Sequence, residues 1–86
     1  MNKNNWYNVR KELPEIDKDV LTYGNNGEFY IAQYVERGKK VAIIKNGKRE
    51  YIFTNWFYDN GEDGWYIIVS HWMPLPGLPD GDDYEN

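Results

Sequence analysis

Two Asn-Gly dipeptides, each set between apolar runs, constrain this sequence most. Asn26-Gly27 lies within the stretch GNNG, and Asn46-Gly47 follows the stretch KVAIIK. Both dipeptides favour the positive φ angles of tight turns, and the flanking runs are rich in β-branched and aromatic residues. Each dipeptide therefore predicts an antiparallel β-hairpin. The four predicted strands are 20–23, 28–35, 39–45 and 48–56.

The remaining segments add strands and no helix. Residues 6–9 predict a first short strand, and residues 65–72 predict a last one whose centre, 67–69, is apolar on both faces. Such a strand is expected to lie centrally in a sheet or to be covered on both sides. No window has a convincing apolar period of 3.6 residues. We expect a mainly β fold: a single small antiparallel sheet or barrel of about five to six short strands joined by hairpins, with little or no helix.

The length of 86 residues predicts one domain. Residues 6–79 are expected to form it, residues 1–5 to be a flexible N-terminus, and residues 80–86 to be a flexible acidic tail. In the loop after the first strand, Leu13 and Ile16 are expected to pack against the core. No apolar run approaches the ~20 residues that span a bilayer. The absence of cysteine favours a reducing cytoplasm, and we expect no membrane association.

The charge pattern argues against direct nucleic-acid binding. The net charge is −4, whereas proteins that bind a phosphate backbone carry a basic stripe. The one basic cluster, residues 39–49, is split by apolar residues. We interpret it as the solvated flanks of a hairpin.

The candidates for catalysis and metal binding are few. His71 is the only histidine and Ser70 the only serine, and neighbouring residues of a strand point to opposite faces. A nucleophilic triad is therefore not predicted. Asp59, Glu62 and Asp63 lie in a turn without the regular ligand spacing of a calcium loop. We expect a non-enzymatic protein without a cofactor or metal ion.

Binding is the remaining class of function. Aromatic residues bracket the acidic turn, and consecutive aromatics in a strand must face both ways, which favours an exposed aromatic surface. Acidic residues of this turn and of the tail, Asp80, Asp82, Asp83 and Glu85, would suit a basic partner. An open sheet edge would allow a homo-oligomer to form or a strand to be added. The candidate binding residues are Trp56, Tyr58, Asp59, Glu62, Asp63, Trp65, Tyr66 and His71.

The two ends of the chain resemble one family. The opening segment, WYNVRKELPEIDKDVLTY, contains Trp6, Val9, Leu13 and Pro14, and the closing segment SHWMPLPGLP covers residues 70–79. Both are similar to the signatures of a small domain of tailed phages and prophages, the domain of unknown function 551. The prolines of the closing segment also suit the end of a strand, because proline has no amide hydrogen to donate. A structural and a functional role for this segment both stay open.

The resemblance implies a setting and no catalytic residues. It implies a phage or prophage accessory protein that works in the bacterial host cytoplasm. We expect it to bind a host protein, such as a defence or nucleic-acid-processing protein. One alternative is a small nucleotide ligand held between aromatic rings, with Arg10, Lys40 or Asn55 to meet its phosphate. Another is a structural or assembly role in the phage particle.

Overall fold

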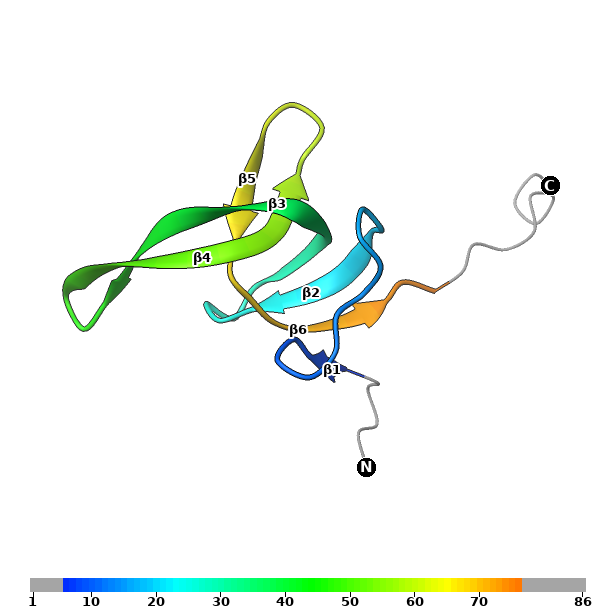
Figure 1. Ribbon diagram of the computed structural model, residues 1–86, viewed down its shortest axis with the longest axis horizontal. Helices are drawn as coiled ribbons and strands as arrows, with labels where there is room; N and C mark the ends of the chain where they lie inside the picture. The colour runs from blue at the N-terminus through cyan, green and yellow to red at the C-terminus, as the bar shows by residue number, and fades with distance from the viewer. Residues whose placement is uncertain (1–5, 77–86) are drawn as a thin grey trace, which may run out of the picture.

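A computed structural model describes residues 6–76, which form one antiparallel sheet of six strands (Figure 1). Within these residues there is no helix, and hence none that could cross a membrane. The predicted mainly β fold is confirmed. Residues 1–5 and the predicted acidic tail, 80–86, lie outside the described range. In the sheet order β1-β6-β2-β3-β4-β5, the strands are β1 (Tyr7–Asn8), β6 (Val69–Pro74), β2 (Val20–Gly24), β3 (Phe29–Lys45), β4 (Lys48–Asp59) and β5 (Gly64–Ile67).

Both predicted hairpins are present. Asn46 and Gly47 have φ angles of 54° and 78°, and Gly27 has a φ angle of 85°. The division into strands differs from the prediction in two places, and several strand ends differ by one to three residues. The segments expected as two strands, 28–35 and 39–45, form the single long strand β3, which belongs to both hairpins. The predicted last strand is divided at Ile68 into β5, which is an edge strand, and β6, which lies between β1 and β2.

A bulge in β3 separates the two hairpins. Tyr34 pairs with Trp56 and Lys39 pairs with Thr54, so residues 35–38 of β3 lie opposite Asn55 alone. The Asn55 Nδ2 group donates to the carbonyl oxygens of Val35 at 2.9 Å and Glu36 at 3.2 Å. These bonds satisfy backbone groups that the interrupted ladder leaves unpaired.

Gly38 allows the two strands to come together again after the bulge. A Cβ atom on Gly38 would lie 2.5 Å from carbons of the Phe53 ring and 2.8 Å from the carbonyl oxygen of Thr54. Real Cβ atoms do not approach other atoms this closely. The close approach therefore requires glycine.

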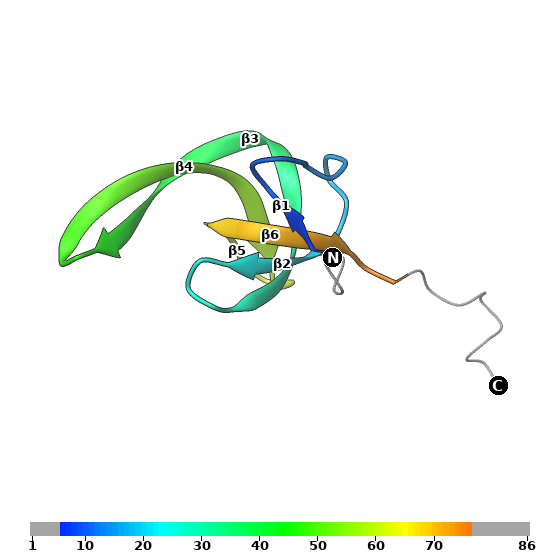
Figure 2. The ribbon, with the colours of Figure 1, turned by 90° about the horizontal axis from the view of Figure 1, so that it is seen from below.

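The bulge divides the sheet into a body and an arm. On the body side, β2 pairs with β3 as far as Ala32, and β5 pairs with β4 from Trp56 onward. Residues 39–54 pair only with each other, and we call this two-stranded segment the arm. Figures 1 and 2 show the arm projecting away from the body.

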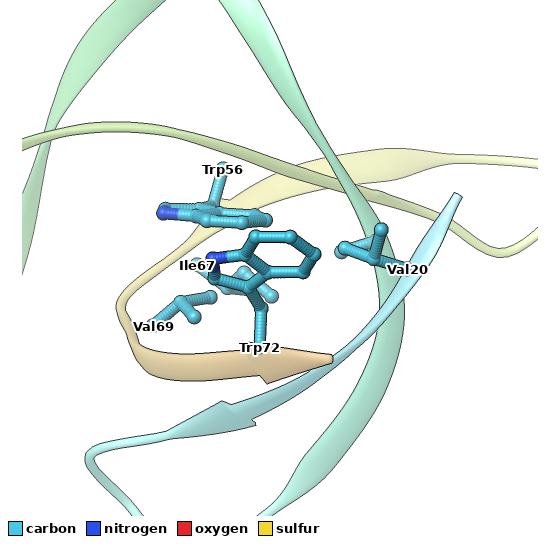
Figure 3. Close-up of a cluster of buried hydrophobic side chains, with 6 residues drawn as sticks. Val20, Trp56, Ile67, Val69 and Trp72 are labelled. Atoms are coloured by element: carbon cyan, nitrogen blue, oxygen red, sulfur yellow. The ribbon is translucent and has the colours of Figure 1, made fainter. Parts of the chain in front are cut away.

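The core lies on the inner face of the curled body. Edge strand β5 continues through Ile68 alone into β6, near the opposite edge, so the sheet must roll up to bring these two strands together. Figure 3 shows Trp56 of β4 and Trp72 of β6 pointing toward one another inside the roll. The buried apolar residues are Val20, Ala32, Trp56, Ile67, Val69 and Trp72.

Backbone contacts, and not the predicted apolar side chains, hold the loop after β1. Leu13 and Ile16 are exposed, so the expectation that they pack against the core is wrong. Instead, the indole Nε1 of Trp72 donates to the carbonyl oxygen of Glu12 in the loop at 2.9 Å. The backbone amide of Asp17 donates to the carbonyl oxygen of Tyr34 at 2.9 Å.

Two tryptophans test the placement of the core. Trp56 is 4% exposed and Trp65 is 46% exposed. Trp56→Ala should lower the free energy of unfolding by about 3–5 kcal/mol, because it removes a large side chain from a packed core. Trp65→Ala should lower the free energy of unfolding much less, because Trp65 is largely exposed. Urea unfolding of both variants measures the difference, and equal losses would contradict this core.

Candidate binding site on the outer sheet face

Four side chains stand side by side across the outer face of the body. Asn8 of β1 pairs with His71 of β6, His71 pairs with Tyr23 of β2, and Tyr23 pairs with Phe29 of β3. His71 precedes the buried Trp72, so its side chain leaves the strand on the side away from the core. The row therefore lies outside the roll.

Three aromatic rings gather at this row. The ring centroids of Tyr23 and Phe29 are 5.1 Å apart. The ring centroid of Trp6 lies 6.3 Å from that of Tyr23 and 6.1 Å from that of Phe29. We call these three residues the aromatic cluster. Phe29 is 60% exposed, although burial of such a ring would be favourable. Trp6 is half-buried and Tyr23 is 37% exposed, and a cluster of partly exposed aromatic rings is typical of a surface that a partner covers.

The aromatic cluster borders a hollow of about 440 Å³, whose other lining residues are Asn8 and His71. Asn8 Oδ1 accepts a hydrogen bond from the Arg10 amide at 2.8 Å. The Nδ2 amide of Asn8 is then the donor that this residue offers to a ligand. The hollow thus combines apolar ring surface with two polar side chains.

Ser70 orients the imidazole of His71. Ser70 Oγ lies 3.0 Å from His71 Nδ1 and donates to the carbonyl oxygen of Tyr23 at 3.2 Å. This contact engages Nδ1 and leaves Nε2 as the ring nitrogen that His71 offers to a ligand.

The expectation that Ser70 and His71 point apart is wrong. Tyr23 pairs with His71 while Gly24 pairs with Val69, so Ser70 is an extra residue in β6 with no pairing partner on β2. At such an irregularity the strict alternation of side chains is lost. The hydroxyl can therefore reach the neighbouring imidazole.

The residues predicted to bind do not form one site. Trp56 is buried in the core and offers no ring face to a partner. Tyr58 packs between Tyr30 and Trp65, with ring centroids 4.8 Å and 5.1 Å away. Tyr66, on the outer face, packs against Phe57, and its hydroxyl donates to the carbonyl oxygen of Arg37 at 3.1 Å. Of the predicted residues, only His71 lines the hollow.

The acidic turn between β4 and β5 has a structural explanation. Asp59 Oδ1 accepts from the Gly61 amide at 2.8 Å, and Asn60 Oδ1 accepts from the amides of Glu62 and Asp63 at 3.0 Å and 2.8 Å. Such side-chain acceptors stabilise tight turns. Among residues 6–76 no group of three or more acidic or histidine side chains could hold a metal ion.

Four residues of the hollow were not predicted from the sequence. They are Trp6, Asn8, Tyr23 and Phe29. The alternation of side chains along a strand puts Phe29 and Ile31 on one face of β3 and Ala32 on the other, and in the structure the first two are exposed and Ala32 is buried. This alternation does not show which face of β3 points away from the core, because both faces carry aromatic residues.

The chain belongs to the family described as protein of unknown function (DUF551), whose model matches residues 5–80. This match confirms the resemblance seen in the two end segments. No curated protein matches the chain, and no solved structure does. The family description assigns no activity.

Tyr30, beside Tyr58, gives a pH-dependent prediction. Its hydroxyl donates to Glu28 Oε1 at 2.9 Å. This hydrogen bond, burial and the charge of Glu28 raise the pKa of Tyr30 above its ordinary value. The stabilisation is present below about pH 10 and is lost as the pH rises through the pKa of the folded state.

Glu28→Gln should therefore lower the pKa of Tyr30, because it removes the negative charge and the carboxylate acceptor. A pH titration of the Tyr30 ring carbon signal by NMR measures the pKa in both proteins. An unchanged pKa in the variant would contradict the assigned cause.

Proposed function

We propose that this protein is a non-enzymatic phage or prophage accessory protein that acts by binding a host protein in the bacterial cytoplasm. The observation that supports this most is the hollow beside the exposed aromatic cluster on the outer face. The phage setting rests on the resemblance of the end segments. The binding role rests on the surface itself.

The form of the hollow favours a protein side chain over a small molecule. Small-molecule sites bury about 70–90% of their ligand. Here the hollow lies on the outside of the sheet, and 60% of the Phe29 surface is exposed to solvent. An aromatic or apolar side chain of a partner could enter the hollow, while the surrounding protein surface would exclude water.

The lining also disfavours a nucleotide. Phosphate recognition uses lysine, arginine or clustered amide groups. Neither Lys nor Arg lines the hollow. Of the residues considered for this role, Asn55 uses its amide in the β3 bulge, Lys40 lies on the arm, and Arg10 lines a separate hollow next to Asn8 and His71.

The charge of the protein indicates the kind of host partner. The net charge of −4 would favour encounter with a basic surface, such as the groove of a nucleic-acid-processing or defence protein. In this proposal the aromatic cluster provides most of the binding affinity, and the acidic surface makes association with the partner faster. Occupation of such a groove would inhibit the partner.

An affinity experiment with matched variants tests the proposal. Tagged protein should retain one host protein from lysate at near-stoichiometric amount, and Phe29→Ala should reduce the affinity at least about tenfold. Phe53→Ala is the control, because Phe53 is also 60% exposed but lies on the arm. This variant should retain the host protein.

Three results would contradict the proposal. The first is retention that Phe29→Ala and Phe53→Ala affect equally. The second is a bound small molecule of defined mass, in native mass spectrometry, without a protein partner. The third is incorporation of the protein into purified phage particles without a host partner.

A further inference from the structure

The arm exposes apolar side chains on the face opposite to the buried Thr54. Three cross-strand pairs make up this outer arm face: Lys40 with Phe53, Ala42 with Tyr51, and Ile44 with Arg49. Ile44, Tyr51 and Phe53 are 70%, 61% and 60% exposed. The face thus presents apolar surface flanked by two cations.

The body covers the arm incompletely. On the inner arm face, Val41, Ile43 and Ile52 are only half-buried. Beyond the bulge, β3 and β4 pair with no third strand of the described chain, so both edges of the arm are open. An isolated two-stranded hairpin is marginally stable in water, and an apolar ribbon of this kind gains stability when a partner covers it.

Charge indicates the nature of that partner. Residues 39–54 contain five basic residues and Glu50, which is a charge of +4. The rest of the described chain, residues 6–38 and 55–76, contains four basic and nine acidic residues, which is a charge of −5. The basic arm of one molecule is therefore complementary in charge to the acidic body of a second copy of the same protein.

The turn between β4 and β5 provides the matching surface. Asp59, Glu62 and Asp63 are exposed there, and Trp65, directly after the turn, is 46% exposed. This surface combines negative charge with an aromatic ring, whereas the outer arm face combines positive charge with aromatic and aliphatic side chains. Both electrostatic and apolar contacts would form when the two meet.

We propose that the outer arm face of one molecule packs against the β4–β5 turn of a second copy, and that the reverse contact forms at the same time. Such a reciprocal contact has twofold symmetry. It occurs twice, which helps the dimer reach the roughly 800 Å² per partner of a stable interface. Direct packing of two outer arm faces is disfavoured, because it would bring together Lys40 and Arg49 of both molecules.

Two charge-reversed proteins test this arrangement. The arm-reversed protein carries Lys40→Glu and Arg49→Glu, and the turn-reversed protein carries Glu62→Lys and Asp63→Lys. Asp59 is left unchanged because its carboxylate accepts the Gly61 amide. The dissociation constant of the dimer should rise at least about tenfold in each reversed protein, because like charges then meet at both contacts.

A mixture of the two reversed proteins should form a heterodimer. The acidic outer arm face of one then meets the basic turn of the other, and the basic outer arm face meets the acidic turn. Native mass spectrometry separates the species by mass, and sedimentation velocity measures the dimer fraction. The body variant Lys11→Glu, Lys18→Glu has the same charge change as the arm-reversed protein and should dimerise as the wild type does.

Apolar variants separate this surface from the proposed host-binding face. Phe53→Ala should weaken the dimer, and Phe29→Ala should leave it intact. The proposal would be overturned if the wild-type protein stays monomeric, even when its arm binds a different protein or a nucleic acid. It would also be overturned if the wild-type protein dimerises but the mixture of arm-reversed and turn-reversed proteins forms no heterodimer.

Discussion

The bulge in β3, held by Asn55, is the constraint on which the rest of the structure depends. Between the pairs Tyr34–Trp56 and Lys39–Thr54, β3 advances five residues and β4 only two. The register therefore shifts by three residues, and an odd shift exchanges the two faces of a strand. Odd-numbered residues of β3 point outward before the bulge and inward after it. One strand can thus cover the core in the body and expose Ile44 in the arm.

The inner face of the body takes two tryptophans and leaves other aromatic rings outside. Trp56 and Trp72 approach each other within the roll, because the short link through Ile68 holds β6 close to β5, which pairs with the Trp56 strand β4. With this space filled, the aromatic cluster of Trp6, Tyr23 and Phe29 has only the outer face. The high aromatic fraction of the chain therefore serves both the core and a surface suited to binding.

Local turn chemistry explains why the hairpins could be predicted from the sequence. The positive φ angles at Asn46 and Gly47 are a property of a few residues. The bulge could not be predicted in this way, because it depends on the bonds from Asn55 to a strand about twenty residues away. The sequence does not show that β3 continues through the bulge, so β3 was expected as two strands. The continuous apolar run around Ile68 gives no sign of the division there, so β5 and β6 were expected as one strand.

The candidate site could be predicted only in part. His71 was identified because it is the one histidine, but its neighbours in the hollow come from β1, β2 and β3 and from Trp6 before them. Strand alternation separates two faces and does not tell which faces the core, so buried Trp56 was taken for a binding residue.

NMR contacts between Hα protons across β3 and β4 test the central role of the bulge most directly. We expect pairing of Tyr34 with Trp56 and of Lys39 with Thr54, with Asn55 opposite the whole of residues 35–38. A register that continues without a shift would instead pair Lys39 with Tyr51. That result would place Val41 and Ile43 on the outer face, and it would contradict the outer arm face that we propose forms the dimer.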